Sequence, residues 1–333
     1  MNAIISREMR LRTVIIAAIA VLLLLNLRIA SNAWLSLSMP DWLQDFITLS
    51  TSVLIESMPF VILGIILSVV VQVWLPPRVI TRWLPKQGLL RRLYVSCFGV
   101  FLPVCECGNV PLARGLVARG FTPAEALTFL LAAPILNPIT LITTHQAFSS
   151  DTRILIARAV GALLIANIIG WLFSRHRNQE EMLTPAFAAS CRQQDSDHSH
   201  GKRTKSFQLF SSELGKILPA LCIGALAAGL IQVLVPREVL IELGSNPALS
   251  ILVMMALAFI IAICSNVDAF FALAFSSTFS VGSIVSFLIF GPMIDIKMLG
   301  LMRTTYRTKV LVQVTALVAL MSIAIGLAVN YAF

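Results

Sequence analysis

Charged residues are scarce in this chain of 333 residues. Asp, Glu, Lys and Arg account for 12% of the sequence, hydrophobic residues account for 58%, and the mean hydropathy is +0.88. A soluble globular protein needs more polar surface than this composition supplies. No basic and aromatic pattern suggests nucleic-acid binding, so the net charge of +9 is attributed to cytoplasmic loops. We therefore predict an all-α polytopic membrane protein.

Three common patterns are also missing. The sequence has no Gly-x-x-x-x-Gly-Lys-Ser/Thr phosphate loop, so any drive by ATP would require a partner. No convincing small-residue cleavage site follows the first apolar run, which is therefore predicted to be a retained signal-anchor helix. The six cysteines form no secreted framework, and we expect no disulfide bonds.

Long apolar runs are abundant. A transmembrane helix needs about 20 apolar residues. Runs that meet or approach this length cover residues 13–30, 53–75, 124–144, 154–173, 214–235, 281–302 and 310–331.

The positions of charged and polar segments predict how the chain divides into an N-terminal segment, two repeats and a linker. Residues 1–47 are expected to hold a cytoplasmic tail, the signal-anchor helix and an external loop, and residues 48–173 the first repeat. Residues 174–206 are rich in polar and basic residues and are predicted to form a solvated cytoplasmic linker, and residues 207–333 form the second repeat. The positive-inside rule then places the N-terminus in the cytoplasm and the C-terminus in the periplasm.

The two halves of the sequence contain residues of the same type at matching positions. Pairs separated by 160 positions are Pro59 and Pro219, Gly64 and Gly224, Gln72 and Gln232, and Pro76 and Pro236. The correspondence continues with Cys107 and Asn109 against Cys264 and Asn266, and with Pro134 and Asn137 against Pro292 and Asp295. Because the basic loop at 76–92 has a weakly charged counterpart at 236–247, the repeats are predicted to be inverted, which is a transporter pattern.

A polar motif interrupts the apolar sequence of the first half. The motif Pro103-Val104-Cys105-Glu106-Cys107-Gly108-Asn109-Val110-Pro111 lies between short apolar pieces at 93–102 and 112–118. Such a pair of short segments predicts a re-entrant hairpin or a broken helix. Pro134 and Pro138 should interrupt the next helix in the same way.

Cysteines and amides are the candidate binding residues. The thiols of Cys105, Cys107 and Cys264 could coordinate a soft ion such as As(III), Cu(I) or Zn(II), although buried cysteines also serve as small apolar packing residues. The amides of Asn109, Asn137 and Asn266 are predicted to line the same site, where they can satisfy backbone groups freed by prolines or contact a solute.

Three carboxylates lie within or beside apolar segments. Glu106, Asp268 and Asp295 are candidates for proton coupling, because an ionisable residue at membrane depth is costly and commonly functional. The alternative is structural, in which a carboxylate caps a half-helix or pairs with Arg114 or Lys297.

The motifs resemble those of a known family. The Cys motif, Ala133-Pro134-Ile135-Leu136-Asn137-Pro138 and Cys264-Ser265-Asn266-Val267-Asp268-Ala269-Phe270 are similar to the bacterial predicted permeases of YraQ type. That family is similar to the ArsP permeases, which export trivalent organoarsenicals and are thought to use cysteine thiols. The resemblance implies a permease.

Together these features favour an inner-membrane efflux permease rather than an enzyme. We expect no cofactor, a small solute or soft metalloid as cargo, and a homo-oligomer as one possible assembly. An intramembrane thiol redox protein and a non-transporting assembly or sensor protein remain the alternatives.

Overall fold

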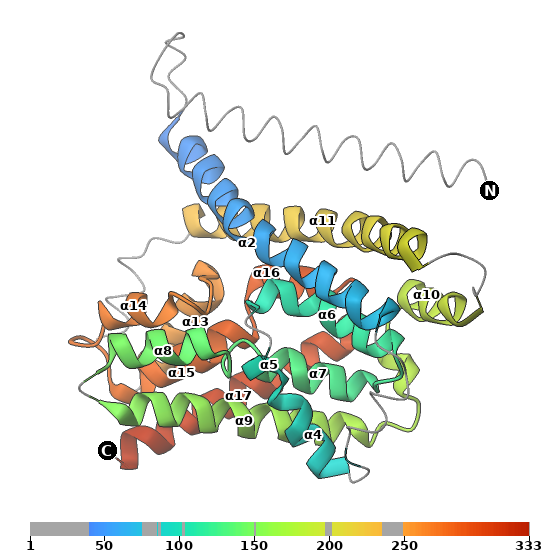
Figure 1. Cartoon of the computed structure of the whole chain (residues 1–333). Helices are drawn as coiled ribbons and strands as arrows, with labels where there is room; N and C mark the ends of the chain where they lie inside the picture. Colours follow the sequence, from blue (N-terminus) through green and yellow to red (C-terminus); the bar gives the residue numbers. More distant parts are fainter. Residues whose placement is uncertain are drawn as a thin grey trace.

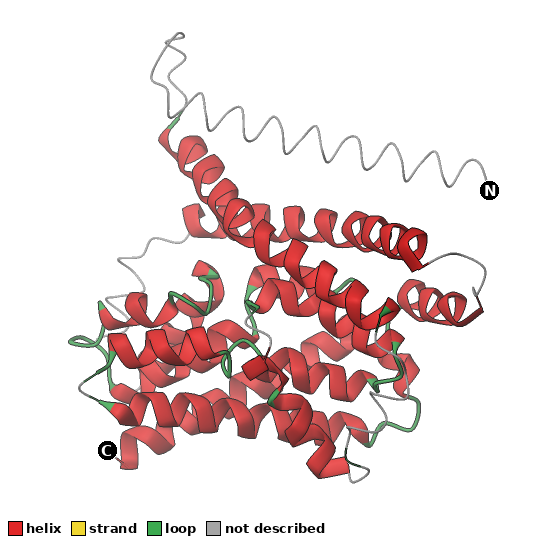
Figure 2. Cartoon of the chain, in the orientation of Figure 1, coloured by secondary structure: helices red, strands yellow, loops and turns green. Residues whose placement is uncertain are grey.

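The structure is a computed structural model that describes residues 40–74, 85, 88–101, 104–149, 151–196, 202–234 and 249–332. Within these ranges every extended regular element is a helix (Figure 2), and one isolated bridge pairs Leu183 with Tyr306. The first half and the linker contain α2 (Asp41–Val73), α4 (Gly88–Ser96), α5 (Phe98–Phe101), α6 (Glu106–Ala118), α7 (Pro123–Ala132), α8 (Pro138–Ala147), α9 (Thr152–Ser174), the 3-10 helix η1 (Gln179–Met182) and α10 (Pro185–Ser196). The second half contains α11 (Lys202–Leu234), α13 (Ser250–Ile261), α14 (Asp268–Leu273), α15 (Val281–Met293), α16 (Ile296–Met302) and α17 (Thr308–Ala332).

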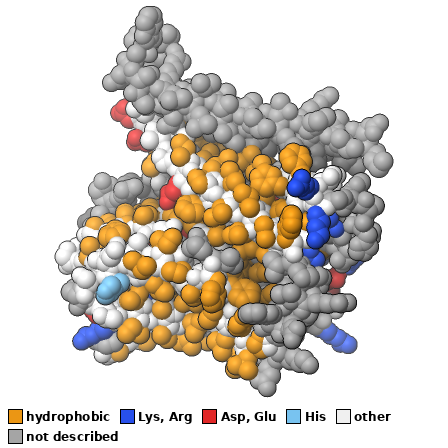
Figure 3. Space-filling view, in the orientation of Figure 1, with side chains coloured by type: hydrophobic (Ala, Val, Ile, Leu, Met, Phe, Trp, Pro, Cys, Tyr) orange, Lys and Arg blue, Asp and Glu red, His pale blue; other side chains and the backbone are white. Residues whose placement is uncertain are grey.

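Among the described residues, five helical segments are long and apolar enough to cross a membrane. They are α2, α9, α11, α17 and the segment Val281–Met302, which contains α15 and α16. Hydrophobic side chains dominate much of the visible surface (Figure 3), as expected for a protein that faces lipid. These features confirm the prediction of an all-α polytopic membrane protein. The predicted signal-anchor helix at 13–30 lies outside the described residues.

Two long helices begin earlier than their apolar runs. We expected apolar segments from residues 53 and 214, whereas α2 begins at Asp41 and α11 at Lys202. The polar residues that precede each apolar run contain neither Pro nor Gly, so nothing in the local sequence stops the helix from extending. Each helix has 33 residues and one internal proline, Pro59 in α2 and Pro219 in α11.

The helices predicted to be discontinuous are broken at their prolines. α7 ends at Ala132, and Asn137 caps α8 by accepting a hydrogen bond from the backbone N–H of Ile139. In the second half, α15 contains Pro292 and ends at Met293, and Asp295 caps α16. Proline removes a backbone donor and clashes with the preceding turn, while Asn and Asp satisfy the first free N–H groups of a new helix.

The Cys motif is more helical than we expected. Helix α6 begins at Glu106 and contains Pro111, so only Val104 and Cys105 among the motif's described residues are non-helical. Pro103 lies outside the described residues. The interruption between α5 and α6 therefore lies before Glu106 and does not include this residue.

The linker also contains ordered structure. We predicted a solvated segment at 174–206, but Met182, Leu183 and Phe187 are buried and the backbone N–H of Thr184 donates to the carbonyl of Thr305. These apolar residues pack on the membrane helices because exposing them would be unfavourable.

Helices α7 and α15 form the centre of the molecule. All residues of α7 are buried, as are residues 282–293 of α15. Helices α9 and α17 pack against α7 and α15, respectively, while α2 and α11 cross each other on the opposite side (Figure 1). Beneath this crossing, α2 packs along α6 and α11 packs along α16.

Candidate functional site

An ion pair between the halves lies beneath the α2 and α11 crossing. Lys297 Nζ on α16 is 3.1 Å from Glu106 Oε1 on α6, and both side chains are almost fully buried. Lys297 Nζ is also 4.0 Å from Asp295 Oδ2 and donates to the carbonyl of Ala262 at 3.3 Å. Two carboxylates thus share one ammonium group in a place from which solvent is excluded.

Thiols approach the other oxygen of Glu106. Cys264 Sγ lies 3.7 Å from Glu106 Oε2, and the hydroxyl of Ser265 donates to the same oxygen at 3.2 Å. The ligand atoms of Cys105, Glu106 and Cys264 all lie within 4.8 Å of one another. One carboxylate and two thiols therefore form a compact set of donors suited to a soft cation.

Cys107, the remaining thiol of the predicted metal set of Cys105, Cys107 and Cys264, lies outside this 4.8 Å group, but its side chain interacts with that of Cys105. Its thiol faces Ser57 Oγ on α2 at 3.6 Å. Cys105 is the extended residue before α6, and Cys107 is the second residue of that helix. Glu106 takes the third position in the group.

Two glycines allow α6 and α16, which carry Glu106 and Lys297, to pack closely against α2 and α11. A Cβ atom at Gly64 of α2 would lie 2.1 Å from the carbonyl oxygen of Gly108, two residues after Glu106. A Cβ atom at Gly224 of α11 would lie 3.2 Å from Lys297 Cα. The repeat pair Gly64 and Gly224 therefore permits close packing next to each partner of the ion pair.

The second-half turn is shaped by Ala262. This residue ends α13 in a left-handed conformation, with φ of 52° and ψ of 43°. Residues other than glycine adopt this conformation at an energetic cost, and such strain is concentrated at functional sites. Here it turns the chain so that Cys264 and Ser265 meet Glu106 while the carbonyl of Ala262 accepts from Lys297.

The predicted amide residues organise the same turns. Asn109 and Asn137 both donate from Nδ2 to the carbonyl of Val104 at 3.4 Å. In the second half, Asn266 Oδ1 accepts from Thr140 Oγ1 at 3.3 Å. All three amides therefore contact the breaks in the helices, with Asn109 and Asn137 gathered around the first Cys turn.

A second buried ion pair holds the other predicted carboxylate. Asp268 Oδ2 at the start of α14 is 2.6 Å from Arg158 on α9, and Arg158 also donates to Thr144 Oγ1 at 2.6 Å. Arg158 was not among the predicted site residues. Its position inside an apolar run of membrane-spanning length was the feature that could have identified it.

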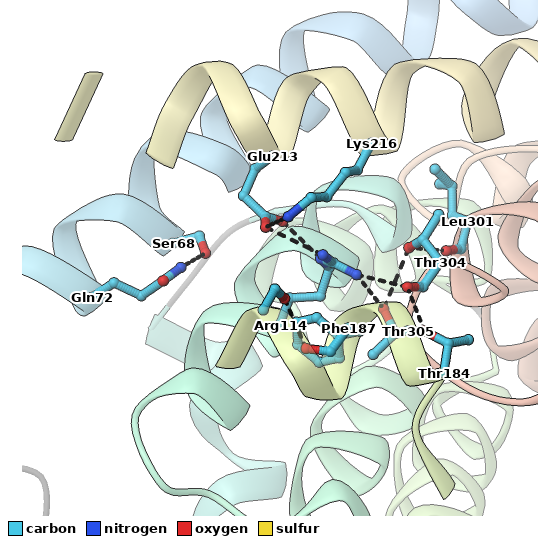
Figure 4. A network of polar contacts seen from close by, with 11 residues as sticks. Ser68, Gln72, Arg114, Thr184, Phe187, Glu213, Lys216, Leu301, Thr304 and Thr305 are labelled. Carbon is cyan, nitrogen blue, oxygen red and sulfur yellow. Dashed lines mark hydrogen bonds and ion pairs between the residues drawn. The ribbon is translucent and has the colours of Figure 1, made fainter. Parts of the chain in front are cut away.

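A third buried ion pair involves Arg114. The guanidinium group of this residue contacts both oxygens of Glu213 on α11, at 2.7 and 3.2 Å, and donates to the carbonyl of Thr304 at 2.8 Å (Figure 4). Arg114 thus pairs with Glu213, which sequence reasoning missed, rather than with a predicted carboxylate. All three buried ion pairs join the first half of the chain to the second.

Several buried oxygens at the site accept no hydrogen bond from the described part of the protein. They are Asn109 Oδ1, Asp268 Oδ1 and Asp295 Oδ2. Buried polar atoms usually have partners, and each exception requires an explanation. Since all three are acceptors, they favour a cation or a proton donor over an anion.

The chain matches one family model, described as predicted permease (ArsP_1), over residues 42–331. It is 33% identical over 282 residues to a Streptococcus mutans protein described as a candidate subunit of a two-component membrane permease complex, covering 83% of this chain and 91% of that one. It is 36% identical over 265 residues to the UPF0718 protein YcgR of Bacillus subtilis, covering 78% of this chain and 87% of that one. No solved structure matches the chain.

Proposed function

Because the chain belongs to the predicted permease family ArsP_1, we propose that it is a secondary permease of the bacterial inner membrane, and not an enzyme, which moves a small soft cation or metalloid between its two halves. The observation that carries this proposal is the compact group of Cys105, Glu106 and Cys264, which combines residues from both halves. A site built from both halves can change its exposure when the halves move relative to each other.

The donor set supports a soft solute such as a trivalent arsenical, Cu(I) or Zn(II). Thiolates bind these species better than hard cations, and a thiol must lose its proton to bind. Solute entry would therefore release protons, while Lys297 would give up part of its contact with Glu106 to the incoming cation. Asn109 Oδ1 and Asp295 Oδ2, which accept no hydrogen bond from the described residues, provide further acceptors.

Proton coupling extends this proposal to Glu106, Asp268 and Asp295. Each carboxylate is buried, and each is within 4.0 Å of a cationic side chain from the described residues. A proton or a solute that neutralises a carboxylate would weaken its ion pair and loosen the contact between the halves. The carboxylates would then couple binding to opening.

The matching order of elements supports an inverted repeat with alternating access. Each half begins with a 33-residue helix, continues through a break at its cysteine motif, and later breaks again before Asn137 or Asp295. We propose that transport proceeds outward, with the N-terminus and the linker in the cytoplasm and the C-terminus in the periplasm. The distribution of basic residues in the sequence favours this orientation.

The Streptococcus mutans relative is described as belonging to a two-component complex, which favours a second membrane subunit as a partner of this chain. A homo-oligomer is the competing assembly. A non-transporting role in such a complex is the second candidate function, and it differs from the first because it predicts no solute flux that depends on Cys105 or Cys264.

Solute accumulation tests the proposal. Cells lacking the protein and cells expressing it would be loaded with methylated or inorganic As(III), Cu or Zn, and the retained element would be measured by mass spectrometry. We expect lower accumulation of one solute with the native protein, loss of that effect in Cys105→Ser and Cys264→Ser, and retention in Cys97→Ser, whose residue is exposed and lies outside the group. Equal accumulation for all solutes, at matched expression, would refute a thiol-dependent carrier of these species.

A further inference from the structure

Helices α6 and α16 run side by side away from the proposed solute site. They pack against each other, and their first turns carry Glu106 and Lys297, whose ion pair lies at that site. Arg114 follows Glu106 by about two turns of α6, roughly 12 Å at about 1.5 Å per residue. Its guanidinium donates to the carbonyl of Thr304, just after α16 ends. A second contact between the halves therefore lies at the end of α6 that meets the linker helix α10.

Arg114 is the centre of this second contact. Its guanidinium holds both carboxylate oxygens of Glu213 on α11, and its Nη1 also lies 3.4 Å from Thr305 Oγ1. The ring of Phe187 on α10 covers the guanidinium at 4.1 Å (Figure 4). All four side chains are buried. Residues from both halves and from the linker thus fill the space between α6, α11 and the turn after α16.

The linker ties the turn after α16 to the first half. The backbone N–H of Thr184 in the linker donates to the carbonyl of Thr305 at 2.9 Å. The hydroxyl of Tyr306 donates to the carbonyl of Pro123, at the start of α7, at 3.0 Å. Gln179 on η1 accepts from the backbone N–H that follows Pro123 at 3.3 Å. The linker and the turn are therefore both fastened to the first turn of α7.

A cavity of about 240 Å³ borders this contact. Arg114 and Ala118, the last residue of α6, line the cavity, so it lies at the end of α6 away from Glu106. Glu213 and Phe187 line it too. A cavity of this size has room for water, which would solvate the charges of Arg114 and Glu213 as they part. Because separating a buried ion pair is costly mainly when the charges stay unsolvated, this pair is placed where it can open.

We propose that the contacts of Arg114 and Tyr306 form a gate, which closes the solute site toward the linker in this structure. Opening the gate separates Arg114 from Glu213 and the turn after α16 from α7, and this exposes the solute site to the face of the protein that carries the linker. The inference rests on the proposed function, because it supplies one of the two exposures that alternating access requires. It does not depend on which solute is carried.

Thiol labelling from one face at a time tests the gate. The full-length protein in inverted and in right-side-out membrane vesicles would be treated with methanethiosulfonate ethyltrimethylammonium, a charged reagent that does not cross membranes. Peptide mass spectrometry would give the modification rates of Cys105 and Cys264. Arg192→Cys, at an exposed position on α10, identifies the vesicles that present the linker. In the native protein we expect slow labelling of both thiols from the linker face, because both are buried.

Two variants should open the gate. The double variant Arg114→Gln, Glu213→Gln removes the ion pair without leaving a buried charge unpaired, and labelling from the linker face should rise at least about tenfold. Tyr306→Phe removes only the hydrogen bond to Pro123 and should raise the rate roughly two- to tenfold. Tyr331→Phe is the matched control, since Tyr331 is exposed near the end of α17 and should leave the rate unchanged. Labelling from the opposite face should not rise in any variant.

Three results would overturn the gate. They are unchanged labelling in both variants, an equal rise from both faces, which would indicate general loosening of the fold, and a rise in Tyr331→Phe as large as that in Tyr306→Phe. If the double variant does not fold, Tyr306→Phe alone decides the question. Because labelling needs no solute, a failure of solute export and a failure of the gate are separate results.

Discussion

Each half of this protein has a 33-residue helix followed by a cysteine turn, yet the two turns are packed differently. In the first half, the turn leads into the 13-residue α6, which α2 covers through the contact between Gly64 and Gly108. In the second half, the turn leads into the six-residue α14, which leaves Val267, Phe270 and Leu273 exposed.

This difference follows from which helix each long helix covers. Helix α11 packs along α16, so α2 and α11 both lie over the side that holds Glu106 and Lys297. Another cross-half contact, between α8 and α14, has Arg158 and Asp268 beside it. The halves therefore meet at one contact that both long helices cover and at another beside the partly exposed α14, and the ion pair at each contact is buried.

The largest expected effect comes from breaking the covered contact. Lys297→Met leaves Glu106 and Asp295 without their shared cation, and breaking a buried pair costs about 3–5 kcal/mol. Denaturant titration followed by tryptophan fluorescence should show this loss in the free energy of unfolding. Adding Glu106→Gln should recover most of it, and a double variant no more stable than Lys297→Met would contradict the pairing.

The equally buried pair of Arg158 and Asp268 should be less sensitive to the loss of its cation. Arg158→Met leaves one carboxylate, Asp268, without its cation, so we expect a loss of about 3 kcal/mol, at the lower end of the range for buried pairs. Asp268→Asn in the same background should restore stability. The comparison fails if Arg158→Met destabilises the protein more than Lys297→Met in the same unfolding assay.

Replacing Gly64 or Gly224 with Ala should have the next largest effect on stability, and the effect should differ between the two positions. In Gly64→Ala the new Cβ meets a backbone carbonyl at 2.1 Å, whereas in Gly224→Ala the nearest atoms are at 3.2 Å. Overpacking costs about 1–3 kcal/mol, and we expect Gly64→Ala to lie near the upper value and Gly224→Ala well below it. Thermal unfolding midpoints would measure both, and equal shifts would show that the two covering helices pack alike.

Helix caps should show the smallest effects and no difference between halves. Thr122 accepts from the N–H of Glu125 at 3.2 Å, and Ser280 accepts from the N–H of Ser283 at 3.3 Å. Each change to Ala should cost about 1 kcal/mol, because each leaves one helix N–H unsatisfied. Thr122→Ser should be nearly neutral in the same unfolding titration, and a loss as large as that in Thr122→Ala would argue against a capping role.

The helix breaks and caps around the candidate site were predictable from the sequence, whereas the residues that its side chains contact were not. The prolines at 134, 138 and 292 indicated where helices break, and Asn137 and Asp295 stand where a cap is needed. Nothing in the sequence indicated that Cys107 would face Ser57 while Glu106 joined Cys105 and Cys264. That arrangement depends on the direction in which α6 presents each side chain, which is set once the helix begins at Glu106.

The sequence by itself determined the membrane class and the breaks in the helices, because hydropathy and proline act over short stretches of the chain. Only the tertiary structure decided the charge pairs. Glu106 and Lys297 are separated by 191 positions, and Arg158 and Asp268 by 110. A buried charge needs a partner, but burial alone does not say which one. The choice is made by the helices that close packing at Gly64 and Gly224 brings together.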